Sequence, residues 1–181
     1  MIKNETLETL KTRRSCRAYK PEMITDEELE TVLDAGTWAP TGMGKQSPIL
    51  IAVQNPEDVA ELSRINAEIF GKPGFDPFYG AKTVIVVLAD AERPTRVEDG
   101  SLVLGNMMNA AASIGLGSCW IHRAKETFER EDGKALLKKW GITGNYTGVG
   151  NCILGYAAEP DKAPAPRKDD YITMSLFNYC N

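Results

Sequence analysis

The stretch Thr83-Val84-Ile85-Val86-Val87-Leu88-Ala89 is apolar and rich in β-branched residues, a composition that predicts the strongest strand of the chain. A shorter apolar run at residues 49–53 precedes it and suits a buried strand. Two more runs, at residues 118–121 and 146–157, follow it as strands. Helical patterns come first along the chain, and the sheet is threaded between helices. This order favours an α+β fold with helices over a mixed sheet, and not a regular βαβ winding.

The helices are predicted from apolar spacing together with capping signals. Thr25 and Glu28 have the spacing of a capping box, and the amphipathic stripe that follows them stops before Pro40. Asn55 and Pro56 make a good N-cap and first-turn pair. These signals predict helices at residues 4–14, from Thr25 to before Pro40, and at residues 55–70, 99–116 and 131–140.

The predicted helix at residues 99–116 has almost no polar face. A helix that is apolar all round has to be covered on every side. In a chain of this length it is either a central core helix or a helix whose second face is closed by another subunit. Asn106, Asn109 and the many alanines favour close helix packing at a subunit interface.

A basic cluster follows the first predicted helix, where Arg13-Arg14-Ser15-Cys16-Arg17 places three guanidiniums and a hydroxyl close together. Arginine presents a planar fork of donors to phosphate oxygens and keeps its charge, and serine adds a directional donor. The alternative is a solvated basic helix end, because cations are favourable near a helix C-terminus. The proline-rich arm Pro164-Ala165-Pro166-Arg167-Lys168 carries two more cations, and the two clusters could converge on one anion.

The length and charge of the chain limit the classes of protein to which it can belong. Its 181 residues suit a single domain, 1–181, and are too few for two comfortable ones. A net charge of -4 argues against a general nucleic-acid surface, so the arginine cluster points to a small anionic ligand. No apolar run is long enough to span a bilayer, and the N-terminus lacks a signal-peptide pattern. We therefore expect a cytoplasmic protein with no nucleic-acid or membrane partner.

The residues that most often carry chemistry in proteins are sparse. Cys16, Cys119, Cys152 and Cys180 are scattered, and His122 is the only histidine, so we expect no metal site and reduced thiols. No triad spacing and no acid–base pair stand out. An enzyme without obvious protein catalysts often leaves the chemistry to a cofactor.

Two further patterns have a structural interpretation. Gly115-Leu116-Gly117 closes a predicted helix, so we interpret it as a helix C-cap and not as a dinucleotide fingerprint. A set of large side chains could line a flat aromatic pocket or could equally be ordinary core. This set consists of Trp38, Met43, Phe75, Phe78, Tyr79 and Trp120.

Several short motifs, each weak alone but specific in their joint order, cover nearly the whole chain. They are Arg13-Arg14-Ser15-x-Arg17-x-Tyr19, the loop from Ala39-Pro40-Thr41 to Gln46, Gly115-Leu116-Gly117-Ser118-Cys119-Trp120-Ile121, Leu154-Gly155-Tyr156 and Pro166-Arg167-Lys168. In this order and spacing the chain resembles the FMN-dependent nitroreductase family, in its small-subunit type. The resemblance implies a central, mixed but mainly antiparallel sheet flanked by helices, with a C-terminal arm that reaches the partner subunit.

The resemblance also implies an activity and an assembly. It implies a homodimer with two FMN molecules at the interface, each touched by both subunits. It implies ping-pong hydride transfer, in which NADH or NADPH reduces the flavin and a nitroaromatic, a quinone or a similar electron-poor acceptor then takes its place. The alternatives are a flavin-fold enzyme with another reaction, such as ene reduction or dehalogenation, and a non-catalytic FMN-binding or storage protein.

The resemblance assigns roles to individual residues. Arg13 and Ser15 would hold the FMN phosphate together with Arg167 and Lys168, and Arg14 would lie along the same tail. Arg17 would sit by the pyrimidine edge of the flavin, where a cation stabilises the reduced ring. A backbone N–H near His122 would face the flavin N5, and Gln46 from the partner would hydrogen-bond the ring edge. The full set of implied cofactor-binding residues is Arg13, Arg14, Ser15, Arg17, Pro40, Thr41, Gly42, Met43, Gln46, Trp120, Ile121, His122, Arg123, Arg167 and Lys168.

The chain also departs from the commoner family pattern. Gly44 stands where many relatives have asparagine, and Ser47-Pro48 follows Gln46 where many have proline and an aromatic residue. His122-Arg123 replaces small or acidic residues. These departures affect contacts to the flavin and the lid over it, so they bear on substrate preference.

Overall fold

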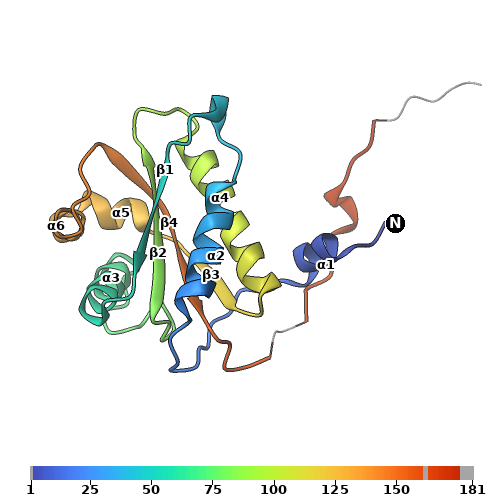
Figure 1. Cartoon of the computed structure of the whole chain (residues 1–181), viewed down its shortest axis with the longest axis horizontal. Helices are drawn as coiled ribbons and strands as arrows, with labels where there is room; N and C mark the ends of the chain where they lie inside the picture. Colours follow the sequence, from blue (N-terminus) through green and yellow to red (C-terminus); the bar gives the residue numbers. More distant parts are fainter. Residues whose placement is uncertain (1, 161–162, 176–181) are drawn as a thin grey trace, which may run out of the picture.

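The computed structural model describes residues 2–160 and 163–175 as a three-layer α+β structure (Figure 1). A four-stranded sheet in the order β1-β2-β4-β3 lies between two layers of helices. The strands are β1 (Pro48–Val53), β2 (Thr83–Asp90), β3 (Gly117–Ile121) and β4 (Tyr146–Gly155). The helices are α1 (Glu5–Thr12), α2 (Asp26–Thr37), α3 (Pro56–Ile69), α4 (Arg96–Ser113), α5 (Ala124–Glu129) and α6 (Glu131–Lys139), with 3₁₀ turns η1 (Gly42–Gly44) and η2 (Asp169–Tyr171).

The pairing of the strands confirms the predicted fold class. Each of the three strand pairs is antiparallel. The parallel component is an isolated bridge between Ser15 and Ser118 at the edge strand β3. This bridge fixes the segment that follows α1 against the sheet.

Strand β2 separates two hydrophobic cores, because successive side chains of a strand point to opposite faces. Ile85, Val87 and Ala89 pack with α2 and α4 on one face. Val84, Val86 and Leu88 pack with α3, α5 and α6 on the other. The run of apolar residues in the sequence therefore reflects a strand that is buried on both sides.

Helix α4 is a central core helix of its layer. A core helix was one of the two alternatives that the sequence left open. Met107 is 0% exposed, and a Cβ on Gly36 of α2 would come within 2.8 Å of its Cγ. A Cβ on Gly100 of α4 would likewise lie 2.6 Å from Cγ2 of Val149 in β4. Glycines therefore allow α4 to pack tightly against both α2 and the sheet. The opposite face keeps apolar side chains in solvent, with Leu102 48% exposed.

Three helix ends carry the capping signals that the sequence predicts. The capping box of Thr25 and Glu28 is formed at the start of α2, and Asn55 caps α3 with its side chain. Gly115 has a positive φ of 82°, and the Leu116 N–H donates to the Ala111 carbonyl at 2.8 Å, which confirms the helix C-cap. The short helix α5 was not predicted, because six residues give no readable periodicity.

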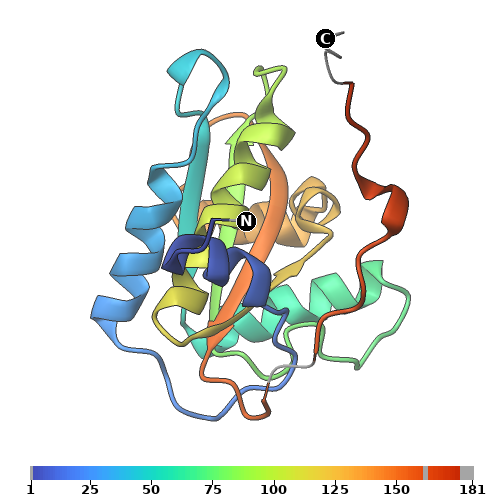
Figure 2. The ribbon, with the colours of Figure 1, turned by 90° about the vertical axis from the view of Figure 1, so that its right-hand side faces the viewer.

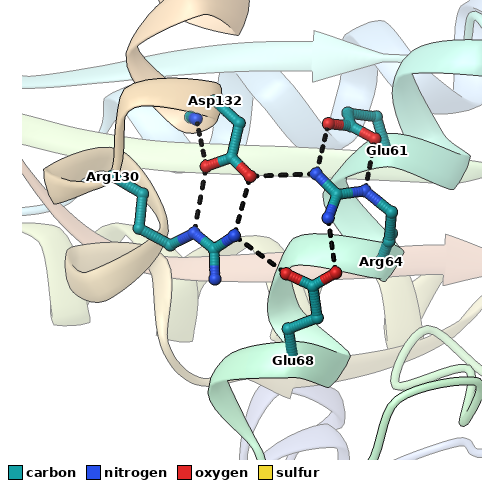
Figure 3. A network of polar contacts seen from close by, with 6 residues as sticks. Glu61, Arg64, Glu68, Arg130 and Asp132 are labelled. Carbon is teal, nitrogen blue, oxygen red and sulfur yellow. Dashed lines mark hydrogen bonds and ion pairs between the residues drawn. The ribbon is translucent and has the colours of Figure 1, made fainter.

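An ion-pair network joins α3 to Asp132 of α6 and to Arg130, which lies between α5 and α6 (Figure 3). Arg64 of α3 contacts Glu61, Glu68 and Asp132 at 2.5–2.9 Å. Arg130 bridges Glu68 and Asp132, each at 2.8 Å. Networks of this kind share the entropic cost of ordering long side chains among several contacts, so they stabilise more than isolated surface pairs.

This network predicts a loss of stability in acid. Hydrogen bonds from Arg130 hold the pKa of Asp132 well below its usual range, and those from Arg64 lower the pKa of Glu61 and Glu68. A lowered folded-state pKa contributes stability that is present above the unfolded value, about 4, and is lost as the pH falls through the folded value. We expect the melting temperature to fall below about pH 4. Asp132→Asn should melt lower than the wild type at pH 7 and show a shallower fall.

Glu131→Gln is the matched control, because Glu131 is a neighbouring exposed carboxylate that pairs with Lys134 and takes no part in the network. Melting curves between pH 7 and pH 2.5 compare the three proteins. Equal acid dependence in Asp132→Asn and the wild type would remove the network as the source of the effect.

Two features lie outside the sheet and its helix layers. Figures 1 and 2 show α1 outside the layer of α2 and α4, and residues 163–175 leaving the body of the molecule on the same side. Every residue from 163 to 175 is exposed. Among the described residues, no helix is long and apolar enough to cross a membrane.

Candidate functional site

The two basic clusters meet at one cavity of about 490 Å³ beside the end of α1. Its lining includes Arg13, Arg14, Ser15 and Arg17 from the segment after α1, and Arg167 from the C-terminal segment. The structure therefore brings together cations that lie about 150 residues apart in the sequence. Lys168 is exposed and does not line this cavity.

The end of α1 accounts for the position of each arginine. The helix ends at Thr12, and the Arg13 N–H donates to the Thr9 carbonyl at 2.9 Å. The Arg14 guanidinium folds back and donates to the carbonyls of Lys11 and Arg13, at 2.9 and 2.6 Å. Arg14 thus caps the C-terminus of α1. This is the role that the alternative interpretation, a basic helix end, gave to the whole cluster.

Arg13 and Arg14 each leave one buried donor unused. Among the described residues, Arg13 Nη1 and Arg14 Nε have no hydrogen-bond partner. A buried donor that carries part of a positive charge is costly without an acceptor, and an anion is the acceptor that it satisfies best. The residues present therefore fit a phosphate group, with Ser15 held beside them by the Cys16 N–H bond to the Ser118 carbonyl at 2.9 Å.

A second group of predicted site residues lies on the loop between α2 and β1, which contains η1. Met43 and Gln46 both have positive φ, 53° and 49°, and Met43 is 83% exposed. Figure 2 shows this loop at the top of the molecule, whereas the chain after α1 runs toward the bottom. The basic cavity of the same chain is lined by none of the predicted site residues of this loop, which are Pro40, Thr41, Gly42, Met43 and Gln46.

Asp99 of α4 holds this loop in place, and sequence reasoning missed it. The carboxylate is buried and accepts hydrogen bonds from the Gly42 N–H at 2.9 Å, the Ser47 hydroxyl at 3.2 Å and the Thr95 hydroxyl at 3.1 Å. Ser47, which departs from the commoner family pattern, thus has a partner in this chain. An acidic residue in the first turn of an otherwise apolar helix was the available signal.

The third group lies where edge strand β3 passes into α5. Trp120 is partly buried and Ile121 is buried, whereas His122 is exposed. Gly150 of β4 makes room for the indole, because a Cβ there would lie 2.5 Å from Trp120 Nε1. Arg123 adopts a left-handed conformation with φ 76°, which is uncommon for a residue with a Cβ.

Asn66 of α3 is a second residue that sequence reasoning missed. It is 1% exposed, and its Nδ2 donates to the His122 carbonyl at 2.8 Å. Its Oδ1 accepts from Arg123 Nε at 3.0 Å. The Arg123 guanidinium also lies 4.4 Å from the centroid of the Phe70 ring, so α3 holds the turn after β3 through both polar and aromatic contacts.

The structure does not gather the proposed aromatic pocket. Phe78 belongs to the core on one face of the sheet and Trp120 packs against the core on the other. Trp38 is 78% exposed at the end of α2. Of this set, Phe75 and Tyr79 pack edge to face, with ring centroids 5.7 Å apart.

The three described thiols are buried. Cys16, Cys119 and Cys152 are free and buried, and Cys180 lies outside the described residues. Burial raises the pKa of Cys152 to about 12 and also raises the pKa of Cys119. A thiol with a raised pKa is a poor nucleophile at neutral pH. Among the described residues, no cluster of three or more His, Cys, Asp or Glu side chains could hold a metal ion.

Comparisons with known proteins agree on one family. The model described as Nitroreductase family matches residues 10–156. A protein of Archaeoglobus fulgidus, named for NADH dehydrogenase and NAD(P)H nitroreductase activities, is 32% identical over 96% of this chain and 94% of its own length. A nitroreductase of Bacteroides fragilis with bound FMN superposes with a TM-score of 0.88 at 30% identity, over 96% of this chain and 100% of the other. A nitroreductase of Desulfitobacterium hafniense with bound FMN gives 0.87 at 26%, over 97% and 100%.

Proposed function

The chain belongs to the nitroreductase family, and from this premise we propose that it is an FMN-dependent oxidoreductase that uses NAD(P)H to reduce nitroaromatics, quinones or similar electron-poor acceptors. Residues 1–181 form one FMN-binding domain in this proposal. The observation that carries it is the buried Arg13 Nη1, which has no partner in the described part of the chain and lies at a cavity lined by arginines from both ends of the sequence.

The basic cavity takes the phosphate end of the cofactor. Arg13 supplies charge and Ser15 supplies a hydroxyl, while Arg167 adds a cation from the C-terminal segment. Arg14 contributes through the charge of a guanidinium whose Nη1 is already bonded to backbone. Charge-assisted hydrogen bonds of this kind each contribute about 1.5–3 kcal/mol.

The complete site needs a second copy of the chain. The loop with Thr41, Gly42 and Gln46 is held rigidly by Asp99, yet it lines no part of the basic cavity of its own chain. Exposed apolar side chains on α4 and on the arm at residues 163–175, among them Leu102 and Ile172, are surfaces that a partner would cover. A homodimer in which each loop and each arm completes the other subunit's site accounts for both features.

The protein's part in the reaction is positioning and electrostatics. FMN would supply the redox chemistry there, as the group that carries a hydride between the nicotinamide and the acceptor. Arg17 places a cation beside the flavin pyrimidine edge, where charge develops on reduction. The turn at His122 and Arg123 offers a backbone N–H to the ring. The nicotinamide and the acceptor would use the same site in turn, so the first has to leave before the second binds.

The spectrum of the purified protein tests this proposal. We expect FMN absorbance in the purified or FMN-reconstituted protein, bleaching with NADH or NADPH under anaerobic conditions, and recovery on adding a quinone or a nitroaromatic compound. Absence of FMN binding would refute the proposal. Tight FMN binding without bleaching would favour a storage protein, and turnover confined to enones or halogenated aromatics would favour the other flavin reactions.

A redox titration of Arg17→Gln tests the place of Arg17. A cation beside the ring favours the anionic reduced form over the neutral oxidised form, so we expect the flavin potential of the FMN-saturated variant to fall and its reduction by NAD(P)H to slow. FMN affinity should change less. A large loss of affinity with an unchanged potential would instead assign Arg17 to the phosphate.

The compartment is part of the same proposal. We place the protein in the cytoplasm, and the buried free thiols Cys16, Cys119 and Cys152 support a reducing environment.

A further inference from the structure

The turn between β3 and α5 is fixed from three directions. Strand β3 pairs with β4 up to Ile121 and Asn151, and the Asn151 side chain donates to the Ile121 carbonyl at 3.3 Å. Helix α5 begins directly against β4, where a Cβ on Gly148 would collide with the Ala124 carbonyl. Asn66 reaches the turn from α3. The turn therefore has little freedom, and its geometry depends on these neighbours.

The bond from Asn66 determines the orientation of one peptide plane. Because a trans peptide directs its carbonyl and its N–H to opposite sides, the Asn66 bond to the His122 carbonyl turns the Arg123 N–H away from α3. Among the described loops and caps, neither this N–H nor that of His122 donates to a backbone carbonyl. Of these two open donors, the Arg123 N–H belongs to the peptide plane that Asn66 orients.

The Asn66 amide is itself held in one orientation. Arg123 Nε donates to Oδ1, so Nδ2 is the group left to face the His122 carbonyl. Helix α3 is fixed in turn by the network of Figure 3, in which Arg64 and Glu68 flank Asn66 along the helix. Asp58 adds a second connection to α6 through Lys139 and the Trp140 indole. Asn66 therefore belongs to a helix whose position is fixed by its contacts with α6.

We propose that Asn66 is a positioning residue for the flavin, which sets the Arg123 N–H against N5 of the ring by holding the His122–Arg123 peptide plane. The proposal rests on the proposed function, since it needs FMN beside this turn. It assigns a role in the reaction to a buried side chain on the far side of the turn from the ring.

The chemistry of N5 gives the sign of the expected effect. N5 of the oxidised flavin is a hydrogen-bond acceptor, whereas N5 of the reduced flavin carries a hydrogen. A backbone donor at N5 therefore stabilises the oxidised form relative to the reduced form, and its loss should raise the flavin potential. Misplacing the ring environment should also slow hydride transfer, by roughly tenfold or more, because small displacements in such sites are costly.

Asn66→Asp is the most direct test. The substitution keeps the shape and an acceptor for Arg123 Nε, but it places a carboxylate oxygen against the His122 carbonyl, so the peptide plane must turn. We expect a higher flavin potential in the FMN-saturated variant and slower reduction by NAD(P)H, with FMN affinity lowered less because the phosphate contacts remain.

Asp58→Asn is the matched control. It lies on the same helix, is buried, and bonds α6 without touching the turn. We expect it to lower the melting temperature while leaving the flavin potential unchanged. A general loosening of α3 would instead change both variants alike.

Arg123→Met is the second variant, for the case in which Asn66→Asp does not fold. It removes the donor that orients the Asn66 amide, and an unbranched side chain can still cover Phe70. We expect a potential shift in the same direction and of smaller size. An unchanged potential and reduction rate in a folded, FMN-saturated Asn66→Asp, or in Arg123→Met if the first is unfolded, would overturn the role of Asn66. Wild-type protein that binds no FMN would overturn the proposed function itself.

Discussion

Arg13→Ala is expected to weaken FMN binding by roughly tenfold or more, because a charge-assisted contact to phosphate contributes on the order of 1.5–3 kcal/mol and each 1.4 kcal/mol is a factor of ten. Within residues 2–160 and 163–175, the buried Arg13 Nη1 has no partner, and, unlike Arg14, Arg13 does not cap α1 through its side chain, so its removal deletes a contact that the helix does not use. Fluorescence titration of the apoprotein with FMN measures the change.

Lys20→Ala is the control for the loss of one positive charge. Lys20 lies in the same segment after α1 but does not line the basic cavity. Its backbone N–H donates a hydrogen bond to the Tyr156 carbonyl. We expect its FMN affinity to stay close to that of the wild type. Equal affinities in Arg13→Ala and the wild type would end the assignment of the cavity to phosphate.

Met107→Asp is expected to unfold the protein. Met107 has no exposed surface and packs against Gly36 within a single chain, so the substitution removes core packing worth about 2–5 kcal/mol and adds an unpaired buried charge. Total stabilities of domains are about 5–15 kcal/mol. Circular dichroism and urea unfolding measure the loss, and a folded variant of near wild-type stability would contradict the packing of α4.

The Leu102→Asp variant tests dimer formation separately from the folding of the subunit. Leu102 lies on the same helix but is half exposed in the single chain. If a partner covers it, the charge should weaken the dimer while the subunit stays folded. Sedimentation velocity at several concentrations measures the association. A wild-type dimer that Leu102→Asp leaves intact would place the interface elsewhere.

Features within one helix or strand were predictable from the sequence. The capping box of Thr25 and Glu28, the N-cap of Asn55 and the glycine C-cap at Gly115 all involve residues a few positions apart. The strength of β2 followed from its composition, since a strand buried on both faces has to be apolar throughout. Local signals of this kind do not depend on the rest of the fold.

The supporting contacts of the site were not predictable, because they join distant parts of the chain. Asp99 meets Gly42 across 57 positions and Asn66 meets His122 across 56. Neither residue belongs to a motif, and each has its role only because α4 or α3 lies against the right loop. The glycines of β4 are a similar case, since Gly148 and Gly150 are required by α5 and Trp120, which the sequence alone does not bring near them.

The central place of β2 has a consequence for amide hydrogen exchange. Its backbone is hydrogen-bonded to β1 on one edge and to β4 on the other, and its side chains belong to both cores. Neither core can form without this strand, so opening its amides requires disruption of both helix layers together. The amides of β2 therefore exchange only through global unfolding, and their protection reports the full unfolding free energy of the subunit, whereas α1 can open at a much lower cost because none of its residues is buried.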